Sequence, residues 1–289
     1  MMTISHKSME EIRIKARELL EKKDADGVLA LRRGEEAVVA PHVFREPGEI
    51  GRLVTEPKWP LAKTAMRILQ SSPRDFRLAV VVRGCDDRAL VELAKRNQVT
   101  EENLRFIGLA CTEEQAQKCL CERPYPRTIN GGKPQPGVHF LQDERVSSLL
   151  QGDTAERMER WAAILRRCIK CYGCRNACPI CVCVPCKLED DVWVEKGSIP
   201  AEMLVFHLIR AFHLSDACVA CGACQEACPV SIPVMALQFA MRQALKDRFG
   251  YEPGLDGARK SPVLKNFLEE PEAGQDYPAW INHGGTGHE

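Results

Sequence analysis

Aromatic residues are few in this chain of 289 residues, and an excess of charge of one sign is missing. It has nine Phe, four Trp and four Tyr, too few to suggest a surface on which nucleic-acid bases stack. Its 40 basic residues balance 40 acidic ones, and a net charge of zero gives no support for nucleic-acid binding or for general attraction to a membrane surface. We therefore expect no nucleic-acid partner.

Long apolar runs are also missing. No segment approaches the length of a membrane span, and residues 1–20 are charged, without the apolar core of a signal peptide. We therefore expect a cytoplasmic protein with no membrane span. In a reducing cytoplasm the 15 cysteines remain available for metals and do not form disulfides.

The signatures of common catalytic sites are absent from the sequence. It has no phosphate loop, no G-x-S-x-G, no H-E-x-x-H and no dinucleotide fingerprint followed by a suitably placed acid. Asp86 and Asp87 are adjacent, so their side chains diverge, and they are better interpreted as residues at the start of a helix. We assign no catalytic residue and no residue that binds an organic cofactor.

One cysteine spacing occurs twice. The run C-x2-C-x2-C-x3-C-P begins at Cys168 and again at Cys218. Bacterial ferredoxins use this spacing to hold two [4Fe–4S] clusters, with three thiolates from one run and the fourth from the other. The predicted ligands of cluster one are Cys168, Cys171, Cys174 and Cys228. Those of cluster two are Cys218, Cys221, Cys224 and Cys178. A pair of structural zinc sites is the alternative, although such sites usually show two C-x2-C pairs.

Four more cysteines precede these repeats. Cys85 and Cys111 each come just after a predicted buried strand, over 77–82 and 104–109, and just before a predicted helix. If the two strands are parallel neighbours, both thiols emerge at the carboxyl edge of the sheet, where α/β proteins place ligands. Cys119 and Cys121 follow at the end of the second helix, so four thiolates can converge on one metal. The alternative is that Cys85 and Cys111 are small buried hydrophobes.

The segments VVVRGCDDRALVELA, LRFIGLACTEE and KCLCERPYP resemble, in order and context, the beta-subunit family of coenzyme F-420-reducing hydrogenases and formate dehydrogenases. The resemblance covers about residues 10–130. In that family the matching cysteines hold a [4Fe–4S] cluster near a flavin. The resemblance therefore implies a third cluster, with the ligands Cys85, Cys111, Cys119 and Cys121.

Two departures from the family pattern matter. The close pair Cys119 and Cys121 is C-x-C rather than the family's usual C-x2-C, so one of these two positions is less secure as a ligand. The family's glycine-rich segments that bind flavin and deazaflavin are missing, and GGKPQPG is too rich in proline to cradle a pyrophosphate. We therefore expect no flavin on this chain.

Cys181, Cys183 and Cys186 extend the first motif into CPICVCVPC. Three thiolates do not complete a tetrahedral set. They are candidates for a further metal site, a cluster or a zinc ion, completed by a residue such as His207 or His213. Redox-active thiols are the alternative, and both histidines are more simply explained as ordinary helix residues.

The remaining pattern predicts an α+β fold in three parts. Residues 1–135 form a small α/β domain with a partly parallel sheet. Residues 150–250 form a mostly helical dicluster ferredoxin-like domain, in which a helix between the two motifs resembles the α-helical ferredoxins of succinate dehydrogenase and heterodisulfide reductase. Residues 251–289 form a C-terminal arm.

Local patterns give two more specific expectations. Ser8 with Glu11 predicts a capping box at the start of the first helix. The helix expected over about 200–214, between the two cysteine motifs, should place Leu204, Leu208 and Ala211 on one apolar stripe.

Clusters with full sets of cysteine ligands have no open position for substrate, so they usually move one electron at a time. We therefore expect an iron–sulfur electron-transfer subunit, without catalytic residues of its own, in a cytoplasmic multi-subunit oxidoreductase of an anaerobe. The resemblance implies a complex of the formate dehydrogenase, hydrogenase or heterodisulfide reductase type. Its expected partners are other subunits of that complex, one of which carries a flavin or the formate dehydrogenase or hydrogenase centre.

Two alternatives remain open. The chain can be an enzyme in its own right, with a flavin that passes electrons to a soluble acceptor. It can instead be a zinc-bound structural protein, which a metal assay would distinguish by zinc without iron or sulfide.

Overall fold

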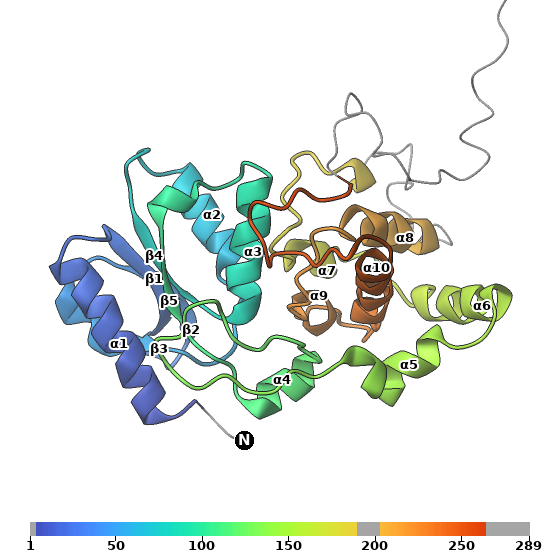
Figure 1. Ribbon diagram of the computed structural model, residues 1–289, viewed down its shortest axis with the longest axis horizontal. Helices are drawn as coiled ribbons and strands as arrows, with labels where there is room; N and C mark the ends of the chain where they lie inside the picture. Colours follow the sequence, from blue (N-terminus) through green and yellow to red (C-terminus); the bar gives the residue numbers. More distant parts are fainter. Residues whose placement is uncertain (1–3, 190–202, 264–289) are drawn as a thin grey trace, which may run out of the picture.

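Within residues 4–189 and 203–263, which the computed structural model describes, five strands form one mixed sheet (Figure 1). The strands are β1 (Gly27–Arg33), β2 (Val39–Phe44), β3 (Leu53–Val54), β4 (Leu78–Val82) and β5 (Leu104–Gly108). The sheet order is β2-β1-β4-β5, and β3 also pairs with β1. The pairs β1–β4 and β4–β5 are parallel, whereas β2 and β3 run antiparallel to β1. The predicted partly parallel sheet is therefore confirmed.

Helices cover both faces of this sheet because side chains alternate between the faces along each strand. On one face, α1 (His6–Glu21) packs Ile12 and Ala16 against the β-strand residues Ala79 and Val81. On the other face, α2 (Ala62–Gln70) and α3 (Gly84–Lys95) pack against the alternate residues, such as Val80. The predicted continuous burial of β4 is confirmed, since all five of its residues are buried.

The start of α1 differs from the predicted capping box. The N-cap is Ser5, whose Oγ accepts a hydrogen bond from the Ser8 N–H at 3.1 Å. The helix therefore begins one turn earlier than expected, and Ser8 lies inside it. The cap prediction was wrong because two serines three residues apart both fit the local signal.

The carboxyl-terminal half is mostly helical, as predicted. The helix α4 (Glu113–Cys119) precedes this half. The α-helices of the half itself, within the described residues, are α5 (Glu144–Leu150), α6 (Thr154–Leu165), α7 (Gly173–Asn176), α8 (Met203–His213), α9 (Ala223–Glu226) and α10 (Val234–Phe249). Phe140 stacks on Phe239 of α10 at 4.6 Å between ring centroids, inside a core shared by α6, α8 and α10. The predicted start of α8 at about residue 200, and the arm beyond residue 263, lie outside the described residues.

The buried face of α8 matches the predicted apolar stripe only in part. Ala211 is buried and Leu204 packs against the core of the helical half, as predicted. Leu208 is 39% exposed, however, whereas Phe206, His207 and Arg210 are 2–3% exposed. A periodicity of apolar residues misplaces this face because an arginine occupies a buried position. The Arg210 Nη2 donates a hydrogen bond to the carbonyl of Cys174 at 2.9 Å.

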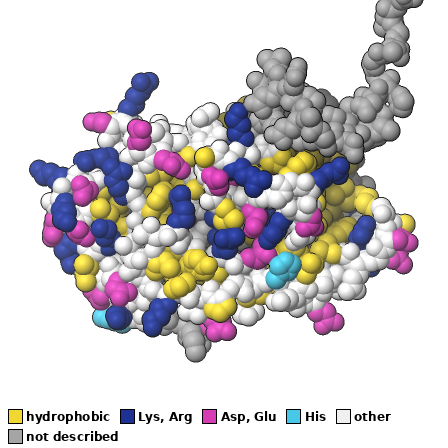
Figure 2. Space-filling view, viewed as in Figure 1, with side chains coloured by type: hydrophobic (Ala, Val, Ile, Leu, Met, Phe, Trp, Pro, Cys, Tyr) yellow, Lys and Arg dark blue, Asp and Glu magenta, His cyan; other side chains and the backbone are white. Residues whose placement is uncertain are grey.

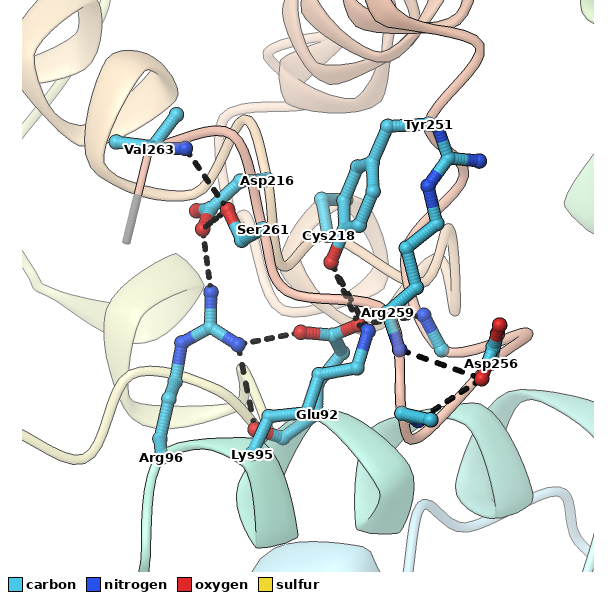
Figure 3. A network of polar contacts seen from close by, with 12 residues as sticks. Glu92, Lys95, Arg96, Asp216, Cys218, Tyr251, Asp256, Arg259, Ser261 and Val263 are labelled. Atoms are coloured by element: carbon cyan, nitrogen blue, oxygen red, sulfur yellow. Dashed lines mark hydrogen bonds and ion pairs between the residues drawn. The ribbon is translucent and has the colours of Figure 1, made fainter. Parts of the chain in front are cut away.

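The two halves share one core and a buried polar network. Leu90 of α3 belongs to the same hydrophobic cluster as Leu214, which precedes the second cysteine motif, and Val219, which lies within it. Beside this cluster, Glu92 of α3 accepts hydrogen bonds from the Tyr251 hydroxyl at 3.2 Å and from the Gly254 N–H at 2.6 Å (Figure 3). The chain after α10 therefore returns across α3, where Figure 1 shows it as the red segment.

Charged side chains of both signs are interspersed over the face shown in Figure 2, in keeping with the neutral total. Among the described helices, none combines the length and the apolar character that a membrane crossing requires. The predicted domain boundaries at residues 135, 150 and 250 stay predictions.

Candidate metal centres

The two cysteine repeats of the sequence are also a structural repeat. Lys170 and Ala220, which occupy the same position in the two motifs, have φ angles of 55° and 54°. In both motifs a four-residue helix follows, α7 in the first and α9 in the second. The left-handed residues turn the loop so that successive thiols point to its inner side. A Cβ on Gly173 would lie 2.8 Å from the Ala227 carbonyl, so the two motifs approach each other closely.

The structure brings the first predicted quartet together. Burial raises the pKa of the Cys168 thiol, the Lys170 N–H lowers it, and the neighbouring Cys171 and Cys228 raise it. Burial likewise raises the pKa of Cys174, and both Cys168 and Cys171 add to that effect. Because Cys228 comes from the second motif, the four thiols combine three residues of one run with one of the other.

The second predicted quartet is also brought together, and it is more deeply buried. Burial raises the pKa of Cys221 well above its usual range, and the thiols of Cys178 and Cys224 raise it further. Burial raises the pKa of Cys218 too, with Cys178 again among its neighbours. In the first quartet, the backbone N–H of Ile232 donates to the Cys228 Sγ at 3.3 Å, which is the kind of N–H···S contact that stabilises thiolates.

The third predicted quartet lies at the carboxyl edge of the parallel strands. Val82 pairs with Gly108 in the β4–β5 register, and Cys85 and Cys111 each lie three residues further along. The predicted parallel neighbours are therefore confirmed. Burial raises the pKa of Cys85, and the charge of Cys111 adds to it.

The rest of the third quartet follows α4. Burial raises the pKa of Cys111, Arg83 lowers it, and Cys121 raises it. The Lys58 ammonium, which donates to the Cys119 Sγ at 3.0 Å, is also held charged by Cys85. These contacts bring all four of the predicted thiols into one neighbourhood.

The chemistry of these donors fits an anionic metal–sulfur group. Four thiolates around one centre need nearby cations and N–H donors. Arg83 Nη1 lies 3.8 Å from the Cys111 Sγ, and Arg88 Nη2 lies 3.7 Å from the Cys121 Sγ. Sequence reasoning missed these arginines, although Arg83 stands only two residues before Cys85. In the part of the chain that the structure describes, no three His, Cys, Asp or Glu side chains are arranged to hold a single metal ion.

The three remaining cysteines lie in different surroundings. Cys181 is hydrogen-bonded to Cys178, and this contact lowers the pKa of Cys178. Cys183 is exposed, while Cys186 lies near Arg175 and packs against the core of the helical half. A further metal site on these cysteines stays a prediction.

The two histidines named with those cysteines differ from each other. His213 is exposed. His207 is 3% exposed, and within the described residues neither of its ring nitrogens has a hydrogen-bond partner. Burial, with a smaller effect of Arg210, lowers the pKa of His207 to about 4. His207 therefore presents a neutral imidazole inside the helical half.

Asp86 and Asp87 have structural contacts, as their interpretation as helix-start residues predicts. The Asp86 carboxylate accepts hydrogen bonds from the backbone N–H groups of Leu61 and Ala62, at 2.7 and 3.2 Å, and so caps α2. Asp87 forms an ion pair with Arg127 at 2.8 Å. Both aspartates hold the segments that surround the third quartet.

A cavity of about 550 Å³ opens beside the third quartet. Cys111, Gly132 and Lys133 line it together with the start of α1. This volume falls within the usual range for sites that bind small molecules.

Comparisons with known proteins agree with this reading of the cysteines. Residues 213–234 match the family model of the 4Fe-4S binding domain. The chain is 29% identical to the F420-dependent formate dehydrogenase subunit beta of Methanocaldococcus jannaschii, over 83% of this chain and 90% of that protein. It is 28% identical to the F420-dependent formate dehydrogenase 1 subunit beta of Methanococcus maripaludis, over 82% of this chain and 88% of that protein. The resemblance predicted from the amino-terminal cysteines is confirmed, and it extends well beyond residues 10–130.

Proposed function

We propose that this chain is the iron–sulfur subunit of a formate dehydrogenase that uses coenzyme F420, and that it relays single electrons through three [4Fe–4S] clusters. The 4Fe-4S binding domain at residues 213–234 and the names of the two relatives support the type of complex. Groups of this kind supply one-electron transfer when all their ligands are cysteines.

Each of the three groups would have its own cysteine quartet. Cluster one would be held by Cys168, Cys171, Cys174 and Cys228, and cluster two by Cys178, Cys218, Cys221 and Cys224. Cluster three would be held by Cys85, Cys111, Cys119 and Cys121. With full cysteine ligation, the part of the chain would be to bind the clusters, to set the distances between them and to shield them from solvent.

The observation that carries the proposal is that the quartets form a series. The thiol of Cys85 in the third quartet raises the pKa of Cys221 in the second, after the larger effect of burial. The thiol of Cys174 in the first quartet is in turn among the neighbours that raise the pKa of Cys224 in the second. Together with the contacts of Lys58 to both Cys119 and Cys221, this supports a series with the second quartet in the middle, which is the arrangement that a relay needs.

The two ends of this series differ in accessibility. Cys171 in the first quartet is exposed, whereas Cys85 and Cys121 in the third are buried. Electrons would enter or leave the first site through a partner subunit that covers Cys171. At the other end, Cys111 borders the 550 Å³ cavity, through which a small redox molecule could approach.

A second candidate function is favoured by that cavity. If it holds a flavin, the chain is an oxidoreductase that passes electrons between its clusters and a soluble acceptor. We expect no flavin, because the glycine-rich segments that bind it in the family are missing. A flavin bound in a stoichiometric amount to the isolated chain would decide for the alternative.

The test is anaerobic isolation of the chain with its native partners, followed by iron, sulfide, zinc and flavin analysis. Three cubane clusters correspond to about twelve irons and as many sulfides per chain. Eight irons would remove the third cluster from the proposal. Zinc without iron or sulfide would replace the proposal with a structural zinc protein.

A further inference from the structure

Lys58 contacts ligands of two different quartets. It lies in the loop between β3 and α2, outside all of the cysteine motifs. Its ammonium donates to the Cys119 Sγ of the third quartet at 3.0 Å and to the Cys221 carbonyl of the second at 2.6 Å. Lys58 therefore places a cation where these two quartets meet.

The side chain of Lys58 is partly buried, and both atoms that accept its hydrogen bonds belong to predicted ligands. A lysine ammonium carries three donors, so one side chain can serve both quartets at once. Its charge therefore lies beside the second and third quartets together.

Arg210 lies in a similar way between the first and second quartets. It is 3% exposed on the inner face of α8. Its Nη2 donates to the carbonyl of Cys174 in the first quartet at 2.9 Å. Its chain neighbour Ala211 lies in the same buried cluster as Cys174 of the first quartet and Cys224 of the second.

The Arg210 guanidinium also retains an unused donor. In the described part of the chain its buried Nε has no hydrogen-bond partner. Buried N–H groups are rarely left without an acceptor. An anionic sulfur group held by the adjacent thiols fits this donor.

We propose that Lys58 and Arg210 are junction cations, each shared by two neighbouring clusters, which allow both neighbours to hold an electron at the same time. This inference rests on the proposed function. Oxidation of one formate to CO2 releases two electrons and one proton, so single-electron carriers must take up the electrons in pairs or in close succession. Adding an electron to one site makes the next site harder to reduce, because charges repel strongly in a buried setting. A cation between the sites opposes that repulsion.

Lys63 provides a matched control. Its ammonium is also partly buried, but it donates to the carbonyls of Asn176, Cys178 and Cys181, at 3.2, 3.3 and 2.8 Å. Of these three residues only Cys178 is a predicted cluster ligand, and it belongs to the second quartet. Replacement of Lys63 therefore removes a similar charge from one site, not from a junction.

The test is a redox titration of the holoprotein followed by electron paramagnetic resonance, on the wild type and on Lys58→Met, Arg210→Met and Lys63→Met. We expect Lys58→Met to lower the potentials of clusters three and two together, and Arg210→Met those of two and one. Lys63→Met should lower that of cluster two alone. Each shift should be about tenfold in the reduction equilibrium, or about 59 mV for one electron.

Lys58→Arg keeps the charge and should restore the wild-type potentials, which a purely structural role would not require. If a Met variant does not retain its iron, the Gln variant at the same position replaces it. The inference is overturned if the variants retain their iron and Lys58→Met shifts one potential or none. Absence of iron and sulfide from the wild type would instead end the proposed function, before any variant is compared.

Discussion

Arg96, the C-cap of α3, forms an ion pair with Asp216, with 2.7 Å between Nη2 and Oδ2 (Figure 3). Asp216 precedes Cys218 of the second quartet by two residues, and Cys85 of the third quartet lies in the first turn of α3. Arg96 also pairs with Glu92, which is fully buried. One helix therefore connects the ligand of one predicted cluster to the loop that holds the next.

Replacement of Arg96 should weaken this connection. Arg96→Met removes the ion pair of the buried Asp216 and one of the two ion pairs of Glu92, which keeps Lys95, so we expect it to lower the free energy of unfolding by about 3–5 kcal/mol. Arg77→Met is the matched control, since the Arg77–Asp26 pair is 36–38% exposed and surface pairs contribute about 0–1 kcal/mol. Anaerobic denaturant titration of the two holoproteins measures both values. Equal losses would show that the buried network does not join the halves.

Gly84 is expected to tolerate no side chain. A Cβ at this position would lie 2.5 Å from the Tyr125 carbonyl and 2.7 Å from that of Arg123. Gly84→Ala should therefore cost about 1–3 kcal/mol through overpacking, and it should displace Cys85, its neighbour in the chain. Gly51→Ala, where nothing lies within 4 Å of the new methyl group, is the control. Loss of the third cluster from the first variant only is the expected result, measured by iron content.

Cys111→Ser tests the assignment of the third quartet. We expect it to lower the iron content by about four per chain, which is one cubane cluster, and to leave the ferredoxin-type signals in place. Cys183→Ser is the comparison, because Cys183 is exposed and belongs to none of the quartets. Unchanged iron in Cys111→Ser would contradict the third cluster. Iron lost from Cys183→Ser would assign that cysteine to a further site.

His207 should make the protein sensitive to mild acid. Its pKa falls from 6.5 to about 4 in the folded chain because burial favours the neutral ring. Between those values the unfolded chain binds more protons, so stability is full above about pH 6.5 and falls as the pH drops towards 4. His207→Phe should reduce this loss, whereas replacement of the exposed His6 should not. Denaturant midpoints of the three proteins at pH 7 and 5.5 provide the comparison, and parallel losses would contradict it.

The regular elements and the grouping of the cysteines could be predicted because their signals are local. Val80 and Ile107 lie in short apolar runs that each end shortly before a cysteine, and two such runs side by side bring Cys85 and Cys111 to one edge. The ferredoxin spacing is associated with a known arrangement of ligands, so an exchange of the fourth ligand between the two motifs could be predicted from sequence. The parallel register of β4 on β5 in the structure then showed that both cysteines follow the same edge of the sheet.

The cations around the quartets could not be predicted, because they come from distant parts of the chain. Lys58 is 61 residues from Cys119 and 163 residues from Cys221. Only the packing of the helical half against the sheet brings these groups together. Asp86 shows the same limit: its place at the start of α3 was predicted, but its capping of α2, some 25 residues earlier, was not.

Helix α8 shows that a buried charged residue can override the apolar periodicity from which a buried face is predicted. Apolar periodicity predicts Leu208 inside, yet Arg210 is the more buried residue. Burial of an arginine is costly unless anionic groups and carbonyls surround it. Here Cys174 supplies a carbonyl, and thiols of two quartets lie close by. The misplaced face is therefore explained by the polar surroundings of Arg210, which apolar periodicity does not reveal.

The most direct measurement is electron paramagnetic resonance of the fully reduced holoprotein, with spins counted per chain. Three adjacent clusters predict about three spins per chain, with broadened signals because neighbouring spins interact, and loss of that broadening at one junction in Cys111→Ser. Two spins with sharp, independent signals, or no signal at all from a chain that contains iron and sulfide, would contradict the account.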